Sequence, residues 1–432
     1  MKKKRIIIIL FFSGLNIYAG AQNESLEYLL FELPDVIFKE TDPPNGFEKA
    51  YELQIKQQVD HNDPSAGTFY QKGYLSHKGF DRPTVMITEG YSIYGNYPYE
   101  LTRFLDANQI QIEHRFFGAS VPDTLDYDYL NLSQASADLH YINQLFRKIY
   151  QGKWLSTGIS KGGATTIFYR YYYPDDVDVS VPYVAPVNKA FEDERIYHFL
   201  DTVGTDDCRE KIKSFQVRML ENRDQVLPIL EKHCNSENLT FTYLTFEEAF
   251  EYGVLEYPFS FWQYGSSCDG IPDDTVPLKQ AVDYLSDVSD ISFFSDRDIE
   301  SYGSHYYQSA TEMGYYGYET EDFKGLLKAL PLYPHPHATF VPDKMKVTFD
   351  GTLLNDVHEW LESEGDHFIY IYGGSDTWSA TAVPPSDEVD ALWFMLKGKS
   401  HSTANIRNMN DEEREKLIST LEKWLSLEIE TP

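Results

Sequence analysis

The sequence predicts an α/β protein with a mainly parallel sheet and a helical insertion late in the chain. Three observations predict this class. Short apolar segments alternate with a helical pattern, a Gly-rich turn joins one such strand to a helix, and a long charged and aromatic segment precedes the last two strands.

The N-terminal segment, residues 1–21, has the layout of a secretory signal peptide. A basic start, Lys2 to Arg5, precedes an apolar run from Ile6 to Leu15 and the small residues Ala19-Gly20-Ala21. An apolar run of about ten residues is too short to span a bilayer as a helix, which takes about twenty. We therefore expect an exported, periplasmic or extracellular protein without stable membrane insertion.

The first half of the mature chain carries the pattern of a hairpin followed by parallel strands. Residues 50–60 and 67–77 flank a cluster of turn formers at 61–67, which predicts a hairpin. Three strand-like runs follow: Pro83 to Thr88, Ile110 to Glu113 and Trp154 to Thr157. Between the last two, apolar residues recur at helical spacing at Ala135, Leu139, Ile142, Phe146 and Ile149. A strand, a helix and a strand in succession favour right-handed crossovers in a parallel sheet.

The second half divides into an insertion and a return to the sheet. A strand is predicted at Val177 to Val184, after which residues 189–343 are first charged and helix-like and then rich in aromatic residues. Strand signals return at Phe368 to Tyr372 and Leu392 to Leu396, and a helix follows from Asp411 to about Leu425. We expect residues 22–188 and 344–432 to form one domain and 189–343 an inserted, largely helical cap domain.

Charge and cysteine content exclude some partners. Loss of the four basic residues of the signal segment lowers the formal net charge from −31 to −35, and so negative a field repels the phosphates of nucleic acids. Any two of Cys208, Cys234 and Cys268 are candidates for a disulfide in an oxidising compartment. Their spacing matches no zinc motif, so no metal is expected.

The Gly-rich turn Gly158-Ile159-Ser160-Lys161-Gly162 follows a predicted strand and precedes a predicted helix. This is the setting of the nucleophile of an α/β-hydrolase, in which a tight turn holds the serine hydroxyl clear of the backbone. The alternative is an ordinary Gly-rich turn, whereas a phosphate-binding loop is excluded because Lys161 follows the serine. Ser160 is thus the predicted nucleophile.

A serine nucleophile needs a base, and the base needs a carboxylate that orients it. In this fold both follow the nucleophile on loops after late strands, with the acid first. Asp376 lies after the strand at 368–372, and His401 follows the strand at 392–396. We predict them as acid and base; the alternatives are an Asx-turn residue and a surface histidine.

Acyl transfer also needs hydrogen-bond donors for the oxyanion. One is expected to be the backbone N–H of Lys161, directly after the nucleophile. The second is expected from the loop after the strand at 83–88, where Gly90 and Tyr91 offer backbone N–H groups and Tyr91 a hydroxyl.

Several segments together resemble the secreted bacterial prolyl tri- and tetrapeptidyl aminopeptidases, relatives of the lysosomal Pro-Xaa carboxypeptidase and dipeptidyl peptidase II. The segments are Thr88 to Tyr91, Glu113 to Gly118, Thr157 to Gly163, Tyr257 to Tyr264, Gly373 to Ser379 and Ser400-His401. The Ser-Lys-Gly-Gly form of the turn favours the aminopeptidase branch. One departure is Thr377, where relatives often have Pro.

The resemblance implies a cofactor-free serine exopeptidase that removes di-, tri- or tetrapeptides from free N-termini of peptides and prefers to cleave after Pro. A Pro-specific carboxypeptidase, an exported esterase and a non-catalytic peptide-binding module remain alternatives. The sequence leaves open the length of the peptide released and the oligomeric state.

Candidate substrate-binding residues follow from this expectation. Glu89, beside the oxyanion loop, is a candidate for binding the terminal ammonium group, with an ion pair to Arg115 or another base as the alternative. Aromatic side chains of the insertion are candidates for packing on a prolyl ring, each with a core role as the alternative: Phe259, Phe261, Trp262, Tyr264, Tyr315 and Tyr316. Glu113-His114-Arg115 is expected to be a buried polar support.

Overall fold

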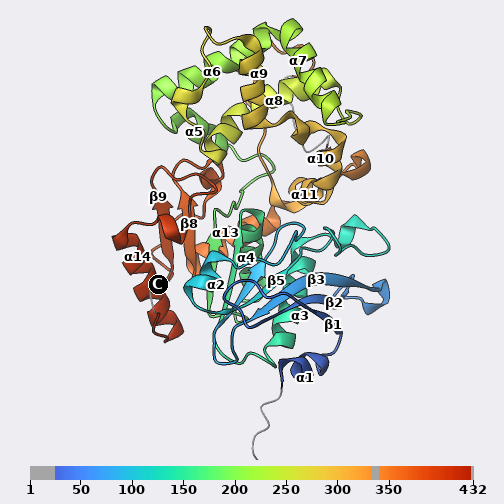
Figure 1. The fold of residues 1–432 in the computed structure, drawn as a ribbon, viewed down its shortest axis with the longest axis vertical. Helices are drawn as coiled ribbons and strands as arrows, with labels where there is room; N and C mark the ends of the chain where they lie inside the picture. The colour runs from blue at the N-terminus through green and yellow to red at the C-terminus, as the bar shows by residue number, and fades with distance from the viewer. Residues whose placement is uncertain (1–24, 332–339, 430–432) are drawn as a thin grey trace, which may run out of the picture.

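The computed structural model describes residues 25–331 and 340–429 (Figure 1), so the predicted signal peptide lies outside the described residues. Nine strands form one sheet in the order β1-β2-β3-β5-β4-β6-β7-β8-β9. They are β1 (Val36–Thr41), β2 (Lys49–Gln58), β3 (Thr68–His77), β4 (Thr84–Thr88), β5 (Asn108–Ile112), β6 (Trp154–Ile159), β7 (Val179–Tyr183), β8 (Ile369–Gly373) and β9 (Leu392–Leu396). Every strand expected from the sequence is present, and β1 is an addition.

The sheet has an antiparallel part and a parallel part. Strands β1, β2, β3 and β5 pair antiparallel, and β2 and β3 form the expected hairpin, with Lys49 opposite His77 and Gln58 opposite Thr68. From β5 through β4, β6, β7 and β8 to β9 all neighbours are parallel. The carboxyl ends of these strands therefore meet at one edge of the sheet, where functional loops gather in open α/β folds.

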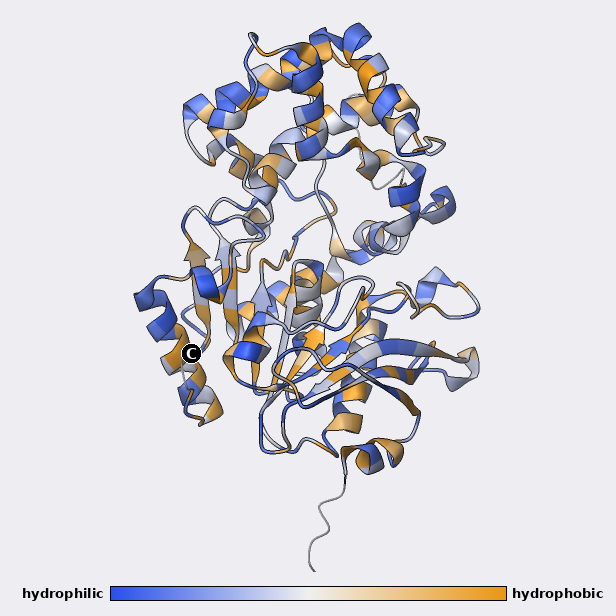
Figure 2. Ribbon diagram, in the orientation of Figure 1, coloured by the Kyte–Doolittle hydropathy of each residue, from blue (hydrophilic) through white to orange (hydrophobic). Residues whose placement is uncertain are grey.

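Helices cover both faces of the sheet because each parallel strand has apolar residues on both sides. Met86 of β4 packs with residues of α3 (Leu132–Phe146), while Val85 and Ile87 face the opposite side with α2 (Glu100–Phe104) and α14 (Asp411–Leu425). Helices α4 (Lys161–Tyr172) and α13 (Thr352–Ser363) share a further apolar cluster with Phe368. Helix α14 alternates hydrophilic and hydrophobic residues, as expected of a helix with one buried face (Figure 2). The short helix α1 (Leu26–Phe31) packs on β1.

Between β7 and β8 the chain leaves the sheet and forms a helical layer beyond its carboxyl edge (Figure 1). The α-helices described there are α5 (Arg195–Thr202), α6 (Asp206–Glu221), α7 (Arg223–Ser236), α8 (Phe246–Tyr264), α9 (Leu278–Ser289), α10 (Asp296–Ser301) and α11 (Gly303–Gln308). They surround an apolar core of their own. The limits 189 and 343 of the inserted domain stay a prediction.

A disulfide joins Cys208 of α6 to Cys268, and Cys234 is a buried free thiol. The sequence could not choose this pair, because which helices lie side by side in the insertion depends on its packing. In the described part of the chain, no helix has the length and apolar character needed to cross a membrane.

Candidate active site

Ser160 occupies a strained turn between β6 and α4, with φ 59° and ψ −125°. This conformation is costly for a residue with a side chain and persists only where its surroundings hold it. The N–H of Ser160 donates to the carbonyl oxygen of Tyr183 (2.9 Å). A Cβ at Gly158 would lie 2.2 Å from the carbonyl oxygen of Gly162, and one at Gly162 would lie 2.6 Å from that of Thr88. The two glycines thus permit the turn, and Ser160 lines a cavity.

Asp376 and His401 form a hydrogen-bonded pair on the loops that follow the last two strands, β8 and β9. Nδ1 of His401 lies 2.8 Å from Oδ2 of Asp376. The carboxylate is fully buried and also accepts from the N–H of Trp378 (3.2 Å) and the hydroxyl of Ser379 (3.5 Å). The side chain of His401 is 13% exposed. In the described part of the chain, the second imidazole nitrogen, Nε2, has no hydrogen-bond partner.

His401 lies beside the turn that carries Ser160. Ile159, the residue before Ser160, lines a surface groove together with His401. Among residues 25–331 and 340–429, no hydrogen bond within 3.5 Å joins Ser160 to His401. Such contacts are often long in free enzymes and shorten when substrate is bound.

Helix α8 of the helical layer accepts hydrogen bonds from the loop that carries Asp376 and from the loop that carries His401. The hydroxyl of Thr377, next to the buried acid, donates to the carbonyl oxygen of Phe259 (2.9 Å). The N–H of His401 donates to the carbonyl oxygen of Gln263 (3.0 Å). The last two turns of α8 therefore hold the acid loop and the histidine loop at once.

The predicted oxyanion donors, Lys161 and the loop at Gly90 and Tyr91, lie close to one another. Within the described residues, the N–H groups of Gly90, Tyr91 and Lys161 donate to no protein acceptor. Lys161 begins α4, and the first N–H groups of a helix have no partner inside it. A Cβ at Gly90 would lie 2.7 Å from Cβ of Lys161, so the loop and the turn are in close contact.

The side chain of Lys161 reinforces this contact, although the sequence prediction concerned only its backbone. Its buried ammonium group donates to the carbonyl oxygen of Gly90 (2.8 Å) and lies 5.4 and 5.1 Å from the ring centres of Tyr91 and Phe117. Burial lowers the pKa of Lys161 to about 7, and the charge of Glu312 opposes this shift. Lys161 thus ties the Gly90 loop to the turn through both its main chain and its side chain.

The cavity at Ser160 has a volume of about 370 Å³ and lies between the sheet and the helical layer. Tyr91, Tyr264 and Tyr315, all expected at the site, line it together with Trp378. Tyr264 is 62% exposed and belongs to the last turn of α8. Aromatic faces therefore surround the predicted nucleophile.

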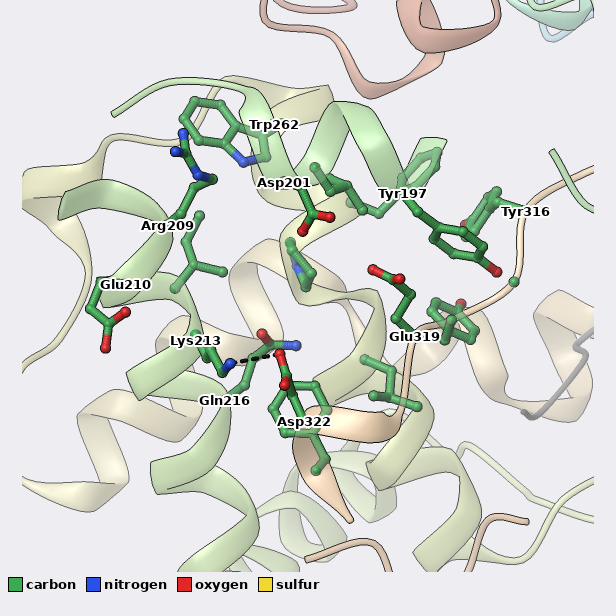
Figure 3. A pocket seen from close by; sticks show the side chains of 18 of the residues that line it. Tyr197, Asp201, Arg209, Glu210, Lys213, Gln216, Trp262, Tyr316, Glu319 and Asp322 are labelled. Carbon is green, nitrogen blue, oxygen red and sulfur yellow. Dashed lines mark hydrogen bonds and ion pairs between the residues drawn. The ribbon is translucent and has the colours of Figure 1, made fainter. Parts of the chain in front are cut away.

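Several predicted substrate-binding residues lie elsewhere, among them Phe261, which is buried in the helical core. Phe259 and Trp262 line a separate cavity of about 380 Å³ among the helices, where Lys213 and Asp322 form an ion pair (Figure 3). Both side chains are buried in the helical core, which was the alternative for each of them. Tyr316 lines both cavities, so the two share a wall.

Glu89 does not line the Ser160 cavity. Its carboxylate accepts hydrogen bonds from the hydroxyl of Tyr99 and from the amide of Gln111 (2.8 Å), and burial raises its pKa. The alternative of an ion pair with Arg115 is wrong, because the fully buried Arg115 pairs with Asp138 (2.7 Å). Arg115 thus belongs to a buried polar support, as predicted.

Glu256, a buried carboxylate of α8, lines the cavity and was not among the residues predicted from the sequence. A signal was present, because Glu256 is a charged residue within an otherwise apolar and aromatic run from Tyr252 to Phe259. A charged side chain inside such a helix is almost never buried without a specific reason.

Three comparisons relate the chain to known proteins. Residues 22–426 match the family model of the PS-10 peptidase S37 family. The chain is 32% identical over 405 residues to the prolyl tri/tetrapeptidyl aminopeptidase of Streptomyces mobaraensis, which covers 91% of this chain and 84% of the relative. It is 31% identical over 150 residues to the putative serine protease F56F10.1 of Caenorhabditis elegans, over 31% of this chain and 28% of the relative.

Among solved structures, the proline iminopeptidase of Mycobacterium smegmatis aligns with a TM-score of 0.41 and 11% identity, over 90% of this chain and 99% of that one. The sheet order and the strained serine turn are those of an α/β-hydrolase fold. Because the family model matches nearly the whole chain, the protein belongs to the S37 family of peptidases and is a serine peptidase.

Proposed function

We propose that this serine peptidase removes short peptides from free N-termini and cleaves after proline, with Ser160 as nucleophile, His401 as base and Asp376 as the acid that orients it. The observation that carries the proposal is the position of Ser160 on a strained turn beside a hydrogen-bonded pair of Asp376 and His401. The name of the Streptomyces mobaraensis relative supports the choice of substrate.

In the acylation step, the hydroxyl oxygen of Ser160 attacks the carbonyl carbon of the proline while His401 takes its proton. The carboxylate of Asp376 stabilises the imidazolium and holds its Nδ1 proton. The N–H of Lys161 and one from the Gly90 loop donate to the oxyanion. His401 then protonates the leaving amine, and the C–N bond breaks.

In the deacylation step, water attacks the ester and His401 acts as base again, which releases the short peptide and restores Ser160. The prolyl ring packs on the aromatic faces of the cavity, among them Tyr91, Tyr264, Tyr315 and Trp378. A helical layer over the cavity (Figure 1) would favour narrow chain ends over folded segments, which supports an exopeptidase.

The charge of the cavity supports amino- over carboxy-terminal cleavage. Its lining contains three carboxylates and, among the described residues, no Lys or Arg that would attract a terminal carboxylate. An esterase that uses the same triad is the second candidate enzyme. A comparison of the hydrolysis of peptide amides with that of acyl esters separates a peptidase from an esterase. A non-catalytic peptide-binding module would bind peptides without turnover.

Export by the segment at residues 1–21 is part of the proposal. The disulfide between Cys208 and Cys268 supports it, because disulfides form and persist mainly in oxidising compartments.

The test is hydrolysis of a panel of peptides with free or blocked ends, varied around one proline. We expect cleavage after Pro from free N-termini only. Ser160→Ala should lower turnover by about 10⁶-fold and abolish covalent labelling by a fluorophosphonate. Ser419→Ala, the same change on the exposed face of α14, serves as control and should retain both.

Labelling that persists in Ser160→Ala would contradict the choice of nucleophile. Release of residues from free C-termini would contradict the direction of cleavage and favour the carboxypeptidase alternative.

A further inference from the structure

The cavity at Ser160 is lined by several acidic groups and, among the described residues, by no Lys or Arg. Three carboxylates face it: Glu256, Asp290 and Asp298. The basic side chain in the lining is His305, and burial lowers its pKa to about 3, so it is neutral at physiological pH. A ligand group that compensates this charge has to be a cation.

Glu256 is the most deeply placed of the three. It is 4% exposed and accepts hydrogen bonds from Ser260 (2.8 Å) on one oxygen and from Tyr316 (2.9 Å) and Tyr318 (2.7 Å) on the other. All three donors are neutral hydroxyls. A carboxylate offers about four acceptor positions, so one is left for a further donor. Burial raises the pKa of Glu256 to about 7, and the three hydrogen bonds oppose this shift.

The other two carboxylates are satisfied differently. Asp298 is paired with Arg297 (2.8 Å) and accepts from the hydroxyl of Ser292 (3.1 Å). Asp290 is exposed to solvent and accepts from the N–H of Ser292 (3.0 Å). Glu256 is therefore the carboxylate that is buried, lines the cavity of the nucleophile and has no ion-pair partner among the described residues.

We propose that Glu256 binds the ammonium group of the substrate's N-terminal residue and thereby makes the enzyme an aminopeptidase. The inference rests on the proposed function, which supplies a substrate with a free N-terminus. A buried carboxylate is unfavourable without a counter-charge, and an ammonium group provides both the charge and hydrogen-bond donors.

Because Glu256 and Ser160 line one cavity, the number of residues that fit between them sets the length of the peptide released. Recognition of the chain end thus resides in the insertion and cleavage in the sheet domain. Glu89, which the sequence favoured for this task, has its carboxylate occupied by Tyr99 and Gln111 outside the cavity lining.

The test compares one peptide-prolyl nitroanilide with a free N-terminus and the same compound with an acetylated N-terminus. The variant is Glu256→Gln, which keeps the shape of the side chain and removes its charge. We expect kcat/KM for the free substrate to fall by about 30-fold or more, mainly through KM, because a buried charge pair is lost. Activity on the acetylated substrate should change little, so the ratio between the two substrates collapses.

The matched control is Asp290→Asn, which removes one negative charge from the same cavity and should leave the ratio within about threefold. Should Glu256→Gln fail to fold, Glu256→Asp withdraws the carboxylate by one methylene and should still reduce the ratio.

A ratio unchanged in folded Glu256→Gln or Glu256→Asp, or a collapse in Asp290→Asn instead, overturns the inference and leaves the proposed function intact. Wild-type protein that cleaves both substrates equally well overturns the proposed function and the inference with it.

Discussion

Replacement of Asp376 by Asn should disable His401 through its tautomer. Oδ1 of Asp376 accepts the N–H of Trp378 (3.2 Å), and Oδ2 accepts the Nδ1 proton of His401 (2.8 Å). In Asp376→Asn the amide oxygen keeps the bond to Trp378, so the amide NH₂ points at Nδ1. The imidazole then accepts at Nδ1 and carries its proton on Nε2, where it cannot take the proton of Ser160.

The size of the effect follows from these contacts. The competent tautomer requires the amide to rotate, which leaves the buried N–H of Trp378 without an acceptor at a cost of about 1–3 kcal/mol. Loss of the carboxylate charge beside the imidazolium removes about another 2–5 kcal/mol of stabilisation. The sum, about 3–8 kcal/mol, spans roughly 10² to 10⁶ in rate, and we expect a fall of about 10⁴ in kcat.

The assay is hydrolysis of a peptide-prolyl nitroanilide, with KM measured alongside kcat. Asp390→Asn is the matched control, since Asp390 precedes β9, at the opposite end of that strand from His401, and pairs with the exposed Lys423. The kcat of Asp390→Asn should stay within about twofold of the wild-type value. A fall of less than tenfold in the kcat of Asp376→Asn would refute the orienting role of Asp376.

Three further predictions follow from other contacts. Gly90→Ala should lower kcat by at least tenfold, because the new Cβ would lie 2.7 Å from Lys161 and displace the oxyanion loop; wild-type kinetics would contradict this placement. The disulfide between Cys208 and Cys268 closes a stretch of 60 residues, so the double Ser variant should lose up to about 4 kcal/mol of stability, seen as a lower melting temperature of the helical layer; an unchanged melting temperature would be inconsistent with a stabilising disulfide. Burial raises the pKa of Glu256 from 4.5 to about 7, so the folded protein binds the extra proton in that window and loses stability as the pH rises through it. Glu256→Gln should therefore melt above wild type at pH 8, with the gain shrinking by pH 5, and a gain that grows towards acid pH would reverse this reasoning.

Much of the sheet domain could be predicted from the sequence, because its elements are local patterns. The strand at 392–396 and the helix at 411–425 have the predicted limits, and the turn at Ser160 was evident from its glycines. Strand β1 was missed because it lies at the edge of the sheet, where half of its residues are exposed and none is fully buried, so it gives no long apolar run.

The substrate-binding residues were predicted less well, since their placement depends on how the insertion packs on the sheet. Nearness in sequence to the oxyanion loop favoured Glu89, yet its side chain turns toward Gln111 of the neighbouring strand. Glu256 is far from Ser160 in the chain and reaches the cavity only because α8 lies over the carboxyl edge of the sheet. Periodicity alone could not distinguish it from a core position.

The hydrogen bonds from Thr377 and His401 to the last turns of α8 connect this helix to the loops that carry the predicted acid and base. A movement of α8 away from the sheet would widen the entrance and, at the same time, break the bonds that steady the acid and histidine loops. Such an opening of the cavity would therefore also disturb the alignment of Asp376 and His401. We therefore expect the pair of Asp376 and His401 to keep its alignment only while α8 lies against the sheet domain.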